Sequence, residues 1–358
     1  MPLTREDMDR PELSVIVPVR NEAPYIGVVL EQLLGQSLEP SRYEILVVDG
    51  LSTDRTREIV ATFMSDHPNI RLLDNPAGLS GCARNVGVEH ARTPNVLFVD
   101  GHCRIRSRDM LAAVVKAFAN GALCISRPQP LIDEDVSRFQ AAAAAARTSW
   151  LGHHTGSQIY TADDHLCSPL SAGCGYTRNL YRELGGIDET FDAGEDLEFN
   201  LRVHQRGIYA HHSHDFEVGY YPRSSCRALF RQLYRYGNGR ARMTRKHPRQ
   251  FSPLSVAVML LVLWILLMPL AVPFWEPALR LWAMPTILYA TGIAALAGWL
   301  SLRRGVSWPL TVAAFLASHF GGGLGYLSGL VGGPRWSHSP GPVLAGSDDA
   351  TKSDPRSV

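Results

Sequence analysis

Two aspartates end apolar, β-branched segments and are the first candidates for chemistry. Asp49 closes Y-E-I-L-V-V-D, and Asp100 closes V-L-F-V-D and begins D-G-H. A carboxylate at a buried sheet edge needs hydrogen bonds, and a bound ligand can supply them. Because Asp100 and His102 are two residues apart, extended backbone would send both side chains to the same side. Together they are candidate ligands for a divalent cation that completes its shell with phosphate oxygens and water.

Three other groups suit a phosphorylated donor. Arg84, in G-C-A-R-N, begins a predicted helix, so it is expected to face a phosphate together with backbone N–H groups; the alternative is an ordinary exposed arginine. The adjacent acids Glu195 and Asp196 also begin a helix, where one acid is normally a cap, and the pair suits a general base. Arg235, between two tyrosines in Q-L-Y-R-Y, is expected to contact a diphosphate leaving group.

These residues lie at the ends of alternating strands and helices. Strands are predicted at 13–18, 43–49, 69–73 and 96–100, and helices at 22–36, 54–64, 81–91 and 108–119. Short apolar runs separated by amphipathic helices are typical of a parallel α/β sheet that is buried on both faces. In such sheets ligands bind beyond the carboxyl ends of the strands. The poly-Ala run Ala141–Ala146 and the segment after Phe191 predict two more helices.

The composition divides the chain into a soluble part and an apolar part. The 35 Lys and Arg residues nearly balance the 34 Asp and Glu residues, which argues against a nucleic-acid partner. Only 19% of the 358 residues are charged, against a usual value of about 25%. Between Phe251 and Pro334 the charged residues are Glu276, Arg280, Arg303 and Arg304.

Four regions follow from this division. We expect an N-terminal tail over residues 1–10, a soluble domain over 11–250, a membrane region over 251–333 and a disordered tail over 334–358. The six cysteines form no C-x-x-C pair, which favours a reduced compartment. No apolar leader precedes the first strand, so the soluble domain is expected to stay in the cytoplasm.

Three apolar stretches, at about 253–275, 281–302 and 308–332, are each long enough for a helix to cross a hydrocarbon core of about 30 Å. Seven basic residues and no acidic one occupy 231–250, and Arg303 and Arg304 lie between the second and third stretches. The positive-inside rule then predicts a multi-pass protein of the cell membrane, with a cytoplasmic catalytic domain and the tail outside. Prolines in the first stretch leave a bent or re-entrant path open.

Glycines recur every four residues in the third stretch, at Gly321, Gly325, Gly329 and Gly333. This spacing puts them on one helix face, where another backbone can approach closely. We expect that face to pack against the other two spans, with a dimer interface as the alternative.

The motifs and their order resemble the family 2 glycosyltransferases of GT-A fold, and in particular their ExoA-like branch, which is associated with succinoglycan assembly. The resemblance runs from about Leu13 to Tyr236 through S-V-I-V-P-V-R-N-E, E-I-L-V-V-D-G-L-S-T-D, G-L-S-G-C-A-R-N-V-G, F-V-D-G-H, G-G-I-D-E-T-F, G-E-D-L-E-F-N-L-R and Q-L-Y-R-Y. It implies a GT-A catalytic domain with a Rossmann-like, mixed and mostly parallel α/β sheet, followed by an all-α transmembrane region. It also implies inverting hexosyl transfer with Mg²⁺ or Mn²⁺.

The resemblance assigns roles by position. Asp196 stands at the catalytic base, Asp49 at the contact to the nucleoside base, and Asp100 at the first acid of the D-x-D metal motif, whose second acid His102 replaces. The expected donor-binding residues are Pro18, Arg20, Glu22, Asp49, Arg84, Asp100, Gln232 and Arg235. The expected acceptor-side residues are Glu195, Gly175 and Tyr236, of which Tyr236 replaces the Trp of Q-x-x-R-W.

The expected function is transfer of a sugar from a nucleotide sugar, with a UDP-sugar as the first candidate, to a lipid-linked saccharide in extracellular polysaccharide or glycolipid assembly. Membrane lipid and other polysaccharide-assembly proteins are the expected partners. The alternatives are a polyprenyl-phosphate glycosyltransferase, a processive polysaccharide synthase, for which three spans are few, and an inactive membrane scaffold. The complete set of Asp49, Asp100, Asp196 and Arg235 argues against the scaffold.

Overall fold

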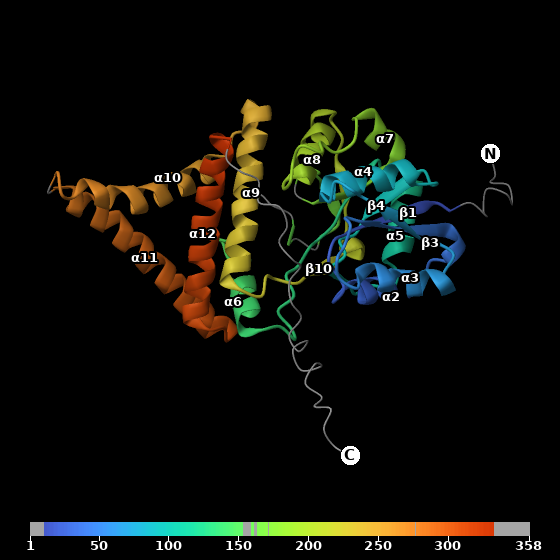
Figure 1. Cartoon of the computed structure of the whole chain (residues 1–358), viewed down its shortest axis with the longest axis horizontal. Coiled ribbons are helices and arrows are strands. Elements are labelled where there is room, and N and C mark those ends of the chain that lie inside the picture. Colours follow the sequence, from blue (N-terminus) through green and yellow to red (C-terminus); the bar gives the residue numbers. More distant parts are fainter. Residues whose placement is uncertain (1–10, 153–158, 161–162, 171, 276, 333–358) are drawn as a thin grey trace, which may run out of the picture.

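The computed structural model describes residues 11–152, 159–160, 163–170, 172–275 and 277–332. The predicted tails, over residues 1–10 and 334–358, lie outside these residues, as do Glu276 and Gly333. Within them, an α/β domain precedes a group of long helices (Figure 1).

The sheet of the α/β domain has eight strands in the order β3-β2-β1-β4-β8-β6-β9-β7. They are β1 (Leu13–Val19), β2 (Tyr43–Asp49), β3 (Ile70–Asp74), β4 (Asn95–Phe98), β6 (Cys124–Ser126), β7 (His165–Cys167), β8 (Gly173–Thr177) and β9 (Ala210–His212). Strands β3, β2, β1 and β4 are parallel neighbours, whereas β8 runs antiparallel to both β4 and β6. A separate two-stranded ribbon pairs β5 (Cys103–Ile105) with β10 (Val218–Tyr220). The mixed, mostly parallel α/β sheet that the sequence predicts is confirmed.

Helices cover both faces of this sheet. They are α2 (Ile26–Leu34), α3 (Thr56–Asp66), α4 (Ser80–His90), α5 (Met110–Ala119), α7 (Arg178–Glu183) and α8 (Glu195–Gln205). Helix α6 (Arg138–Arg147) packs instead against the long helices at the end of the chain. Short 3₁₀ turns are η1 (Pro40–Arg42), η2 (His214–Phe216), η3 (Pro248–Gln250) and η4 (Met268–Ala271).

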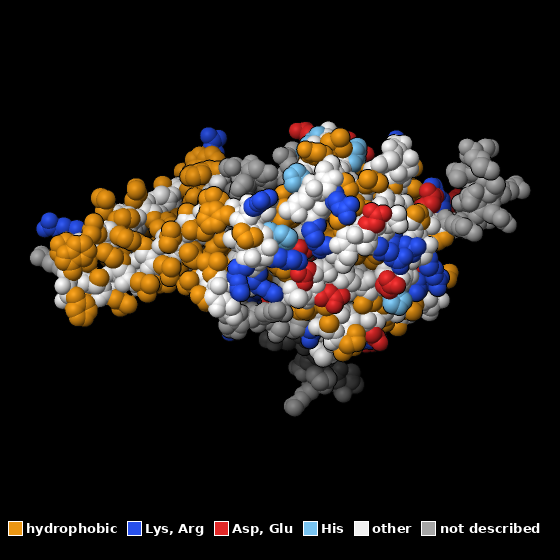
Figure 2. Space-filling model, turned by 90° about the horizontal axis from the view of Figure 1, so that it is seen from above, with side chains coloured by type: hydrophobic (Ala, Val, Ile, Leu, Met, Phe, Trp, Pro, Cys, Tyr) orange, Lys and Arg blue, Asp and Glu red, His pale blue; other side chains and the backbone are white. Residues whose placement is uncertain are grey.

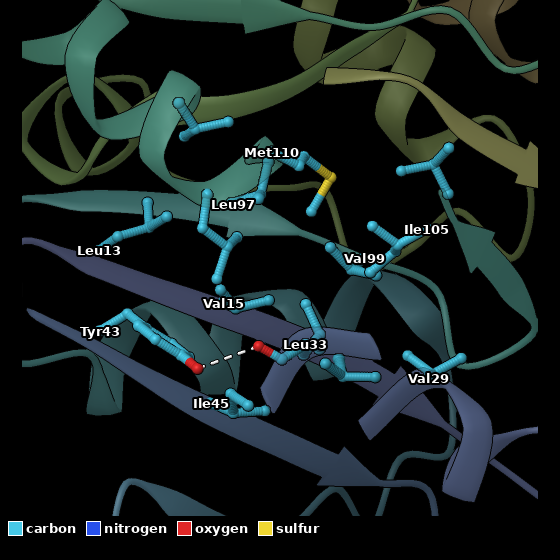
Figure 3. Packing of buried hydrophobic residues seen from close by; sticks show 14 of the residues in the cluster. Leu13, Val15, Val29, Leu33, Tyr43, Ile45, Leu97, Val99, Ile105 and Met110 are labelled. Atoms are coloured by element: carbon cyan, nitrogen blue, oxygen red, sulfur yellow. Dashed lines mark hydrogen bonds between the residues drawn. The ribbon is translucent and has the colours of Figure 1, made fainter. Parts of the chain in front are cut away.

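The two faces form separate hydrophobic cores because side chains alternate along each strand. Val15 and Val17 of β1 pack with α2, α3 and α5, while Ile16 between them packs with α4, α7 and α8. Figure 3 shows the first core, in which the Tyr43 hydroxyl donates a hydrogen bond of 3.0 Å to the backbone oxygen of Leu33. Since β1 and β2 are buried on both faces, their carboxyl ends are held rigidly, and these ends position the residues of the candidate site.

Four long helices follow the α/β domain: α9 (Cys226–Lys246), α10 (Pro253–Leu267), α11 (Pro277–Arg304) and α12 (Trp308–Leu330). Helices α9 and α12 stand side by side, with the sheet beyond α9 and the hairpin of α10 and α11 beyond α12 (Figure 1). Three helices are long and apolar enough to cross a membrane, over Pro253–Ala271, Pro277–Arg304 and Trp308–Leu330.

The glycine face of α12 packs differently from the expectation. Gly321, Gly325 and Gly329 face backbone carbonyls of α9, which is not one of the predicted spans. The physical reason is that α9, with Gly237 and Gly239 of its own, offers a backbone that can come as close as these glycines allow. The prediction of packing against the other two spans is therefore wrong for these three positions.

Candidate active site

A buried ion-pair network joins two of the predicted motifs. The Arg84 guanidinium, on α4, donates from Nη1 to Glu195 Oε1 at 2.8 Å and from Nη2 to Asp100 Oδ1 at 3.3 Å. The Arg84 side chain is 11% exposed and that of Glu195 is 9% exposed. Arg84 thus holds the start of α8 against the loop that follows β4, although these segments are far apart in the sequence. Arg84 is buried and paired with two carboxylates, so it is not an ordinary exposed arginine, and a contact with a donor phosphate stays a prediction.

Asp100, the first of the two predicted metal ligands, is held by a hydrogen bond as well as by its ion pair with Arg84. Its Oδ2 accepts a hydrogen bond of 2.5 Å from the Tyr220 hydroxyl of β10. Burial alone would raise the pKa of Asp100, but Arg84 and His102 outweigh it and, with the Tyr220 hydrogen bond, lower that pKa to about 2. Asp100 is therefore a carboxylate at neutral pH, and with 27% of its side chain exposed it retains a face toward solvent.

His102 lies in the turn between β4 and β5, not on extended backbone as the spacing predicted. Its Nδ1 pairs with Glu22 Oε1 at 2.9 Å. Burial lowers the pKa of His102, but Glu22, its hydrogen bond and Asp100 together raise it. A protonated ring cannot ligate a metal, so His102 has to lose its proton to become a ligand.

The side chains of this turn, Asp100 and His102, supply only some of the ligands that a divalent cation needs. Within the described residues no group of three His, Cys, Asp or Glu side chains forms a metal site. Mg²⁺ is usually held by one or two carboxylates plus substrate phosphates, and Asp100 offers one such carboxylate. The residues therefore fit a cation that arrives with a nucleotide diphosphate, with Asp100 as the main protein ligand and His102 as an auxiliary one.

The contact of α8 with α9 places Arg235 against the loop that precedes Asp196. Gly194 adopts a φ of 75° and starts α8, and it lies against Gly239 of α9. A Cβ at Gly239 would collide with the backbone of Ala193, so only a glycine permits this approach. Asp196 is exposed in the first turn of α8, and Arg235 Nη2 donates to the backbone oxygen of Asp192 at 2.6 Å. An exposed carboxylate thus stands beside a cationic helix at the carboxyl edge of the sheet.

Two residues that the sequence analysis missed complete the surroundings of Asp100. Tyr220 holds its carboxylate, as described above. Arg127, directly after β6, is 3% exposed, and its Nε and Nη1 have no hydrogen-bond partner among the described residues. Its charge contributes to the low pKa of Asp100. No signal in the sequence indicated this role, because the burial of Arg127 is seen only in the structure.

Comparison with known proteins shows which family the chain belongs to. The model for glycosyl transferase family 2 matches residues 14–184, and the model for glycosyl transferase family group 2 matches residues 107–302, which is more than half of the chain. The chain is a family 2 glycosyltransferase.

Relatives that match most of the chain support this placement. The succinoglycan biosynthesis protein ExoA of Rhizobium meliloti is 28% identical over 90% of this chain and 96% of its own. A dolichyl N-acetyl-alpha-D-glucosaminyl phosphate 3-beta-D-2,3-diacetamido-2,3-dideoxy-beta-D-glucuronosyltransferase of Methanococcus voltae is 26% identical over 65% of this chain and 74% of its own.

A solved structure shares the fold. The mannosyltransferase PcManGT of Pyrobaculum calidifontis, in complex with GDP-Man and Mn²⁺, has a TM-score of 0.56 and 23% identity, covering 87% of each chain. The expected GT-A fold of this glycosyltransferase is therefore confirmed.

The three residues predicted on the acceptor side of this glycosyltransferase differ in their burial and contacts. Gly175 lies in β8, where a Cβ would meet Ile125 and the backbone of β4, and its acceptor-side role stays a prediction. Glu195 turns toward Arg84 and the predicted donor residues, not toward an open acceptor side. Tyr236 is 43% exposed on α9, and its hydroxyl accepts a hydrogen bond of 3.2 Å from Gln232 Nε2.

Asp49 has partners within the chain. Its fully buried carboxylate accepts hydrogen bonds from the Ser52 backbone at 3.0 Å and the Ser52 hydroxyl at 2.5 Å, and it pairs with Arg57 at 2.9 Å. The argument that Asp49 needs a ligand to satisfy it is therefore wrong, although its position at the carboxyl end of β2 is as predicted.

The remaining predicted donor residues surround the end of β1. Pro18 pairs with Val48 of β2, and Arg20 donates to the backbone oxygen of Gly78 at 3.3 Å. Glu22 is buried and, besides its contact with His102, has an Oε2 without a hydrogen-bond partner among the described residues. These residues lie on the same edge of the sheet as Asp100.

Proposed function

We propose that this glycosyltransferase is a membrane-bound, inverting enzyme that moves a sugar from a nucleotide sugar to a lipid-linked saccharide. The observation that carries the proposal is the Arg84 network, which joins Asp100 to the start of α8, where Asp196 lies, next to helices that can enter a membrane. We place its work in extracellular polysaccharide or glycolipid assembly, since ExoA is named for succinoglycan biosynthesis. Association with other polysaccharide-assembly proteins is part of this proposal.

The donor is a nucleotide sugar, and a UDP-sugar is the first candidate. Solved relatives hold GDP-Man in PcManGT and UDP-GlcNAc in TarS of S. aureus, whose TM-score to this chain is 0.51 at 15% identity over 91% of this chain and 93% of that one. The donor is expected to lie between the end of β2, where Asp49 is found, and Asp100 after β4. Arg84 positions Asp100 in this scheme.

Asp196 acts as the general base. An acceptor hydroxyl is a weak nucleophile, and a positioned carboxylate that takes its proton accelerates attack by about 10²- to 10⁴-fold. Asp196 suits this task because its carboxylate is exposed, whereas the neighbouring Glu195 is committed to Arg84. Arg235 stands one helix away and stabilises the charge that develops on the departing diphosphate.

Asp100, assisted by His102, would hold Mg²⁺ or Mn²⁺ with the donor. Such an ion supplies charge neutralisation to the leaving diphosphate when it is bound. Tyr220 and Arg84 keep the Asp100 carboxylate ionised and fixed in place before the donor arrives.

A lipid-linked acceptor follows from the neighbourhood of the site. Helix α9 carries Arg235 and Tyr236 on its way from the α/β domain to the apolar helices, so an acceptor sugar can reach Asp196 while its lipid stays in the bilayer. A cytoplasmic catalytic domain is proposed because the cations of α9 and of Arg303 and Arg304 lie beside the apolar helices.

The test is product analysis by mass. Membranes that contain the protein are incubated with a panel of nucleotide sugars and a lipid extract, and the lipid fraction is analysed. A lipid-linked saccharide extended by one sugar is expected. A glycosyl polyprenyl phosphate would show that the carrier lipid itself is the acceptor, a polymer would show a processive synthase, and no transfer with any donor would contradict the proposal and favour a scaffold.

A further inference from the structure

Helices α9 and α12 run side by side and in the same direction along most of their length. A Cβ at Gly321 would lie 2.6 Å from the backbone oxygen of Phe230, and one at Gly329 would lie 2.6 Å from that of Asn238. Gly325, midway between them, faces the backbone of Tyr234 in the same way. Equal steps of four residues on both helices mean that the two backbones stay in contact over several turns.

The opposite side of α9 belongs to the α/β domain. Arg235 donates to the Asp192 backbone, and Lys246 pairs with Asp188 at 2.6 Å and with Glu198 at 2.8 Å. These contacts extend from the middle of α9 to its end. Helix α9 therefore lies between the α/β domain and α12, and all three are held as one block.

This arrangement conflicts with a membrane crossing by α12. If α12 stood across a hydrocarbon core of about 30 Å, α9 and the charged surface of the α/β domain would stand at the same depth. Helix α9 carries seven Arg and Lys residues within 21 residues. Charges at that depth are costly, and they are rare within membrane spans.

The burial of the three apolar helices separates α12 from the other two. In its most apolar window, 44% of the α12 residues are buried inside the protein, against 11% for α10 and 11% for α11. Phe315 and Ala314 of α12 pack with Ala143 of α6 and Leu229 of α9 in one cluster. Protein contacts thus bury a much larger share of α12 than of α10 or α11.

The α10–α11 hairpin has the opposite character. Its large side chains are exposed, with Phe274 at 91%, Leu288 at 74% and Met284 at 72%. Figure 2 shows this end of the molecule covered by hydrophobic side chains, whereas the α/β domain has a mixed surface. Helix α11 has 28 residues and is about 42 Å long, which is enough to cross the bilayer when tilted. At its base Arg304 donates to the Thr148 hydroxyl, at the end of α6, at 2.7 Å.

We infer that only the α10–α11 hairpin enters the bilayer, crossing it twice, and that α6, α9 and α12 form a platform along the lipid surface on the side of the catalytic domain. The hydrocarbon of the bilayer surrounds the hairpin, and lipid headgroups face the platform. The chain leaves α12 at Leu330 on the same side as the catalytic domain. This replaces the expectation of three crossings with the tail outside, and it holds whatever sugar or acceptor the enzyme uses.

Labelling of one introduced cysteine at a time in the full-length chain tests this topology, with the five buried native cysteines left in place and the Cys226→Ser chain as the blank. With the exposed Cys226 changed to Ser, a cysteine is introduced by Val358→Cys, by Phe274→Cys near the hairpin tip, or by Asp66→Cys on the catalytic domain as the control. A membrane-impermeant maleimide is added to right-side-out vesicles before and after permeabilisation.

The experiment tests the position of α12 and the two crossings of the α10–α11 hairpin separately. The proposal expects the Val358→Cys and Asp66→Cys chains to react only after permeabilisation, and the Phe274→Cys chain to react before it. Reaction of the Val358→Cys chain before permeabilisation, with the Asp66→Cys chain still protected, would show that α12 crosses and would overturn the proposal. Failure of the Phe274→Cys chain to react before permeabilisation would overturn the two crossings of the hairpin.

Discussion

Removal of the Arg84 guanidinium tests whether the buried ion-pair network holds the site together. Arg84 links α4 to the loop after β4 and to the start of α8 through Asp100 and Glu195. The variant Arg84→Met keeps much of the side-chain volume but leaves both carboxylates without this partner. Glu195 in particular is 9% exposed and would become a buried, uncompensated charge.

The expected loss can be worked out from burial. Removing one partner of a buried ion pair costs about 3–5 kcal/mol, because the remaining charge stays desolvated. For a domain of about 150–250 residues, each kcal/mol lowers the midpoint of thermal unfolding by about 2–4 °C. We therefore expect Arg84→Met to lower that midpoint by about 6–20 °C. The double variant Arg84→Met/Glu195→Met should recover part of the loss, since it removes the orphaned charge as well.

The assay is thermal unfolding in one detergent, with Arg182→Met as the matched control. Arg182 pairs with Glu89 at 3.5 Å on the surface, where the two side chains are 47% and 76% exposed. A surface pair of this kind is worth about 0–1 kcal/mol, so the control should shift the midpoint by a few degrees at most. If Arg84→Met unfolds at the same temperature as Arg182→Met, the network does not hold the site and the reasoning is refuted.

Three further predictions test other parts of the structure. Gly325→Ala forces a Cβ against a carbonyl of α9 and should destabilise the protein by about 1–3 kcal/mol. Gly322→Ala, whose Cβ meets open space, is the control and should not destabilise it. Equal midpoints of thermal unfolding for the two variants would contradict the packing of α9 on α12. Burial raises the pKa of Glu198, but hydrogen bonds from Arg, Lys and His neighbours outweigh it and lower that pKa below 4.5. The stability that Glu198 contributes is therefore present above pH 4.5 and is lost as the pH falls through the lowered pKa of the folded state. Glu198→Gln should flatten the pH dependence of unfolding in that range. An unchanged pH profile would count against these contacts. Chelation of divalent cations and Asp100→Ala should each abolish sugar transfer, while His102→Ala should have a milder effect. Full activity in excess chelator would show that transfer needs no divalent cation.

The sheet and its functional edge could be predicted from the sequence. The run Tyr43–Asp49 is the strand β2, and Asp49 and Asp100 lie at the carboxyl edge as expected. This worked because strands buried on both faces are continuous apolar runs, and a carboxylate at the end of such a run stands out. The helix that begins with Glu195 was likewise indicated by the glycine turn before it.

The partners of these carboxylates could not be predicted. Arg84 meets Glu195 across 111 positions of the sequence, and Tyr220 meets Asp100 across 120. No local pattern records such pairs, because they depend on how the loops fold over the edge of the sheet. Strand β8 could not be predicted either, because a short glycine-containing strand has too few side chains to show an alternating pattern.

The apolar helices show a second limit of sequence reasoning. Length and hydropathy are similar for a helix that crosses a membrane and for one that is buried in protein, and α11 and α12 meet the same criteria. The proposal that α12 stays outside the bilayer rests on its contacts with α9 and α6, which its sequence does not show.

The role of Asp196 is the central claim, and its replacement by Asn tests it most directly. Asp196→Asn removes the base and leaves the residues around Asp100 untouched, so donor affinity should persist while turnover falls by at least about 10²-fold. Asp66→Asn, an exposed aspartate at the end of α3, is the matched control and should behave as the unaltered protein. The measurement is turnover at saturating nucleotide sugar together with the donor dissociation constant. Turnover of the Asp196→Asn protein close to that of the control would contradict the account.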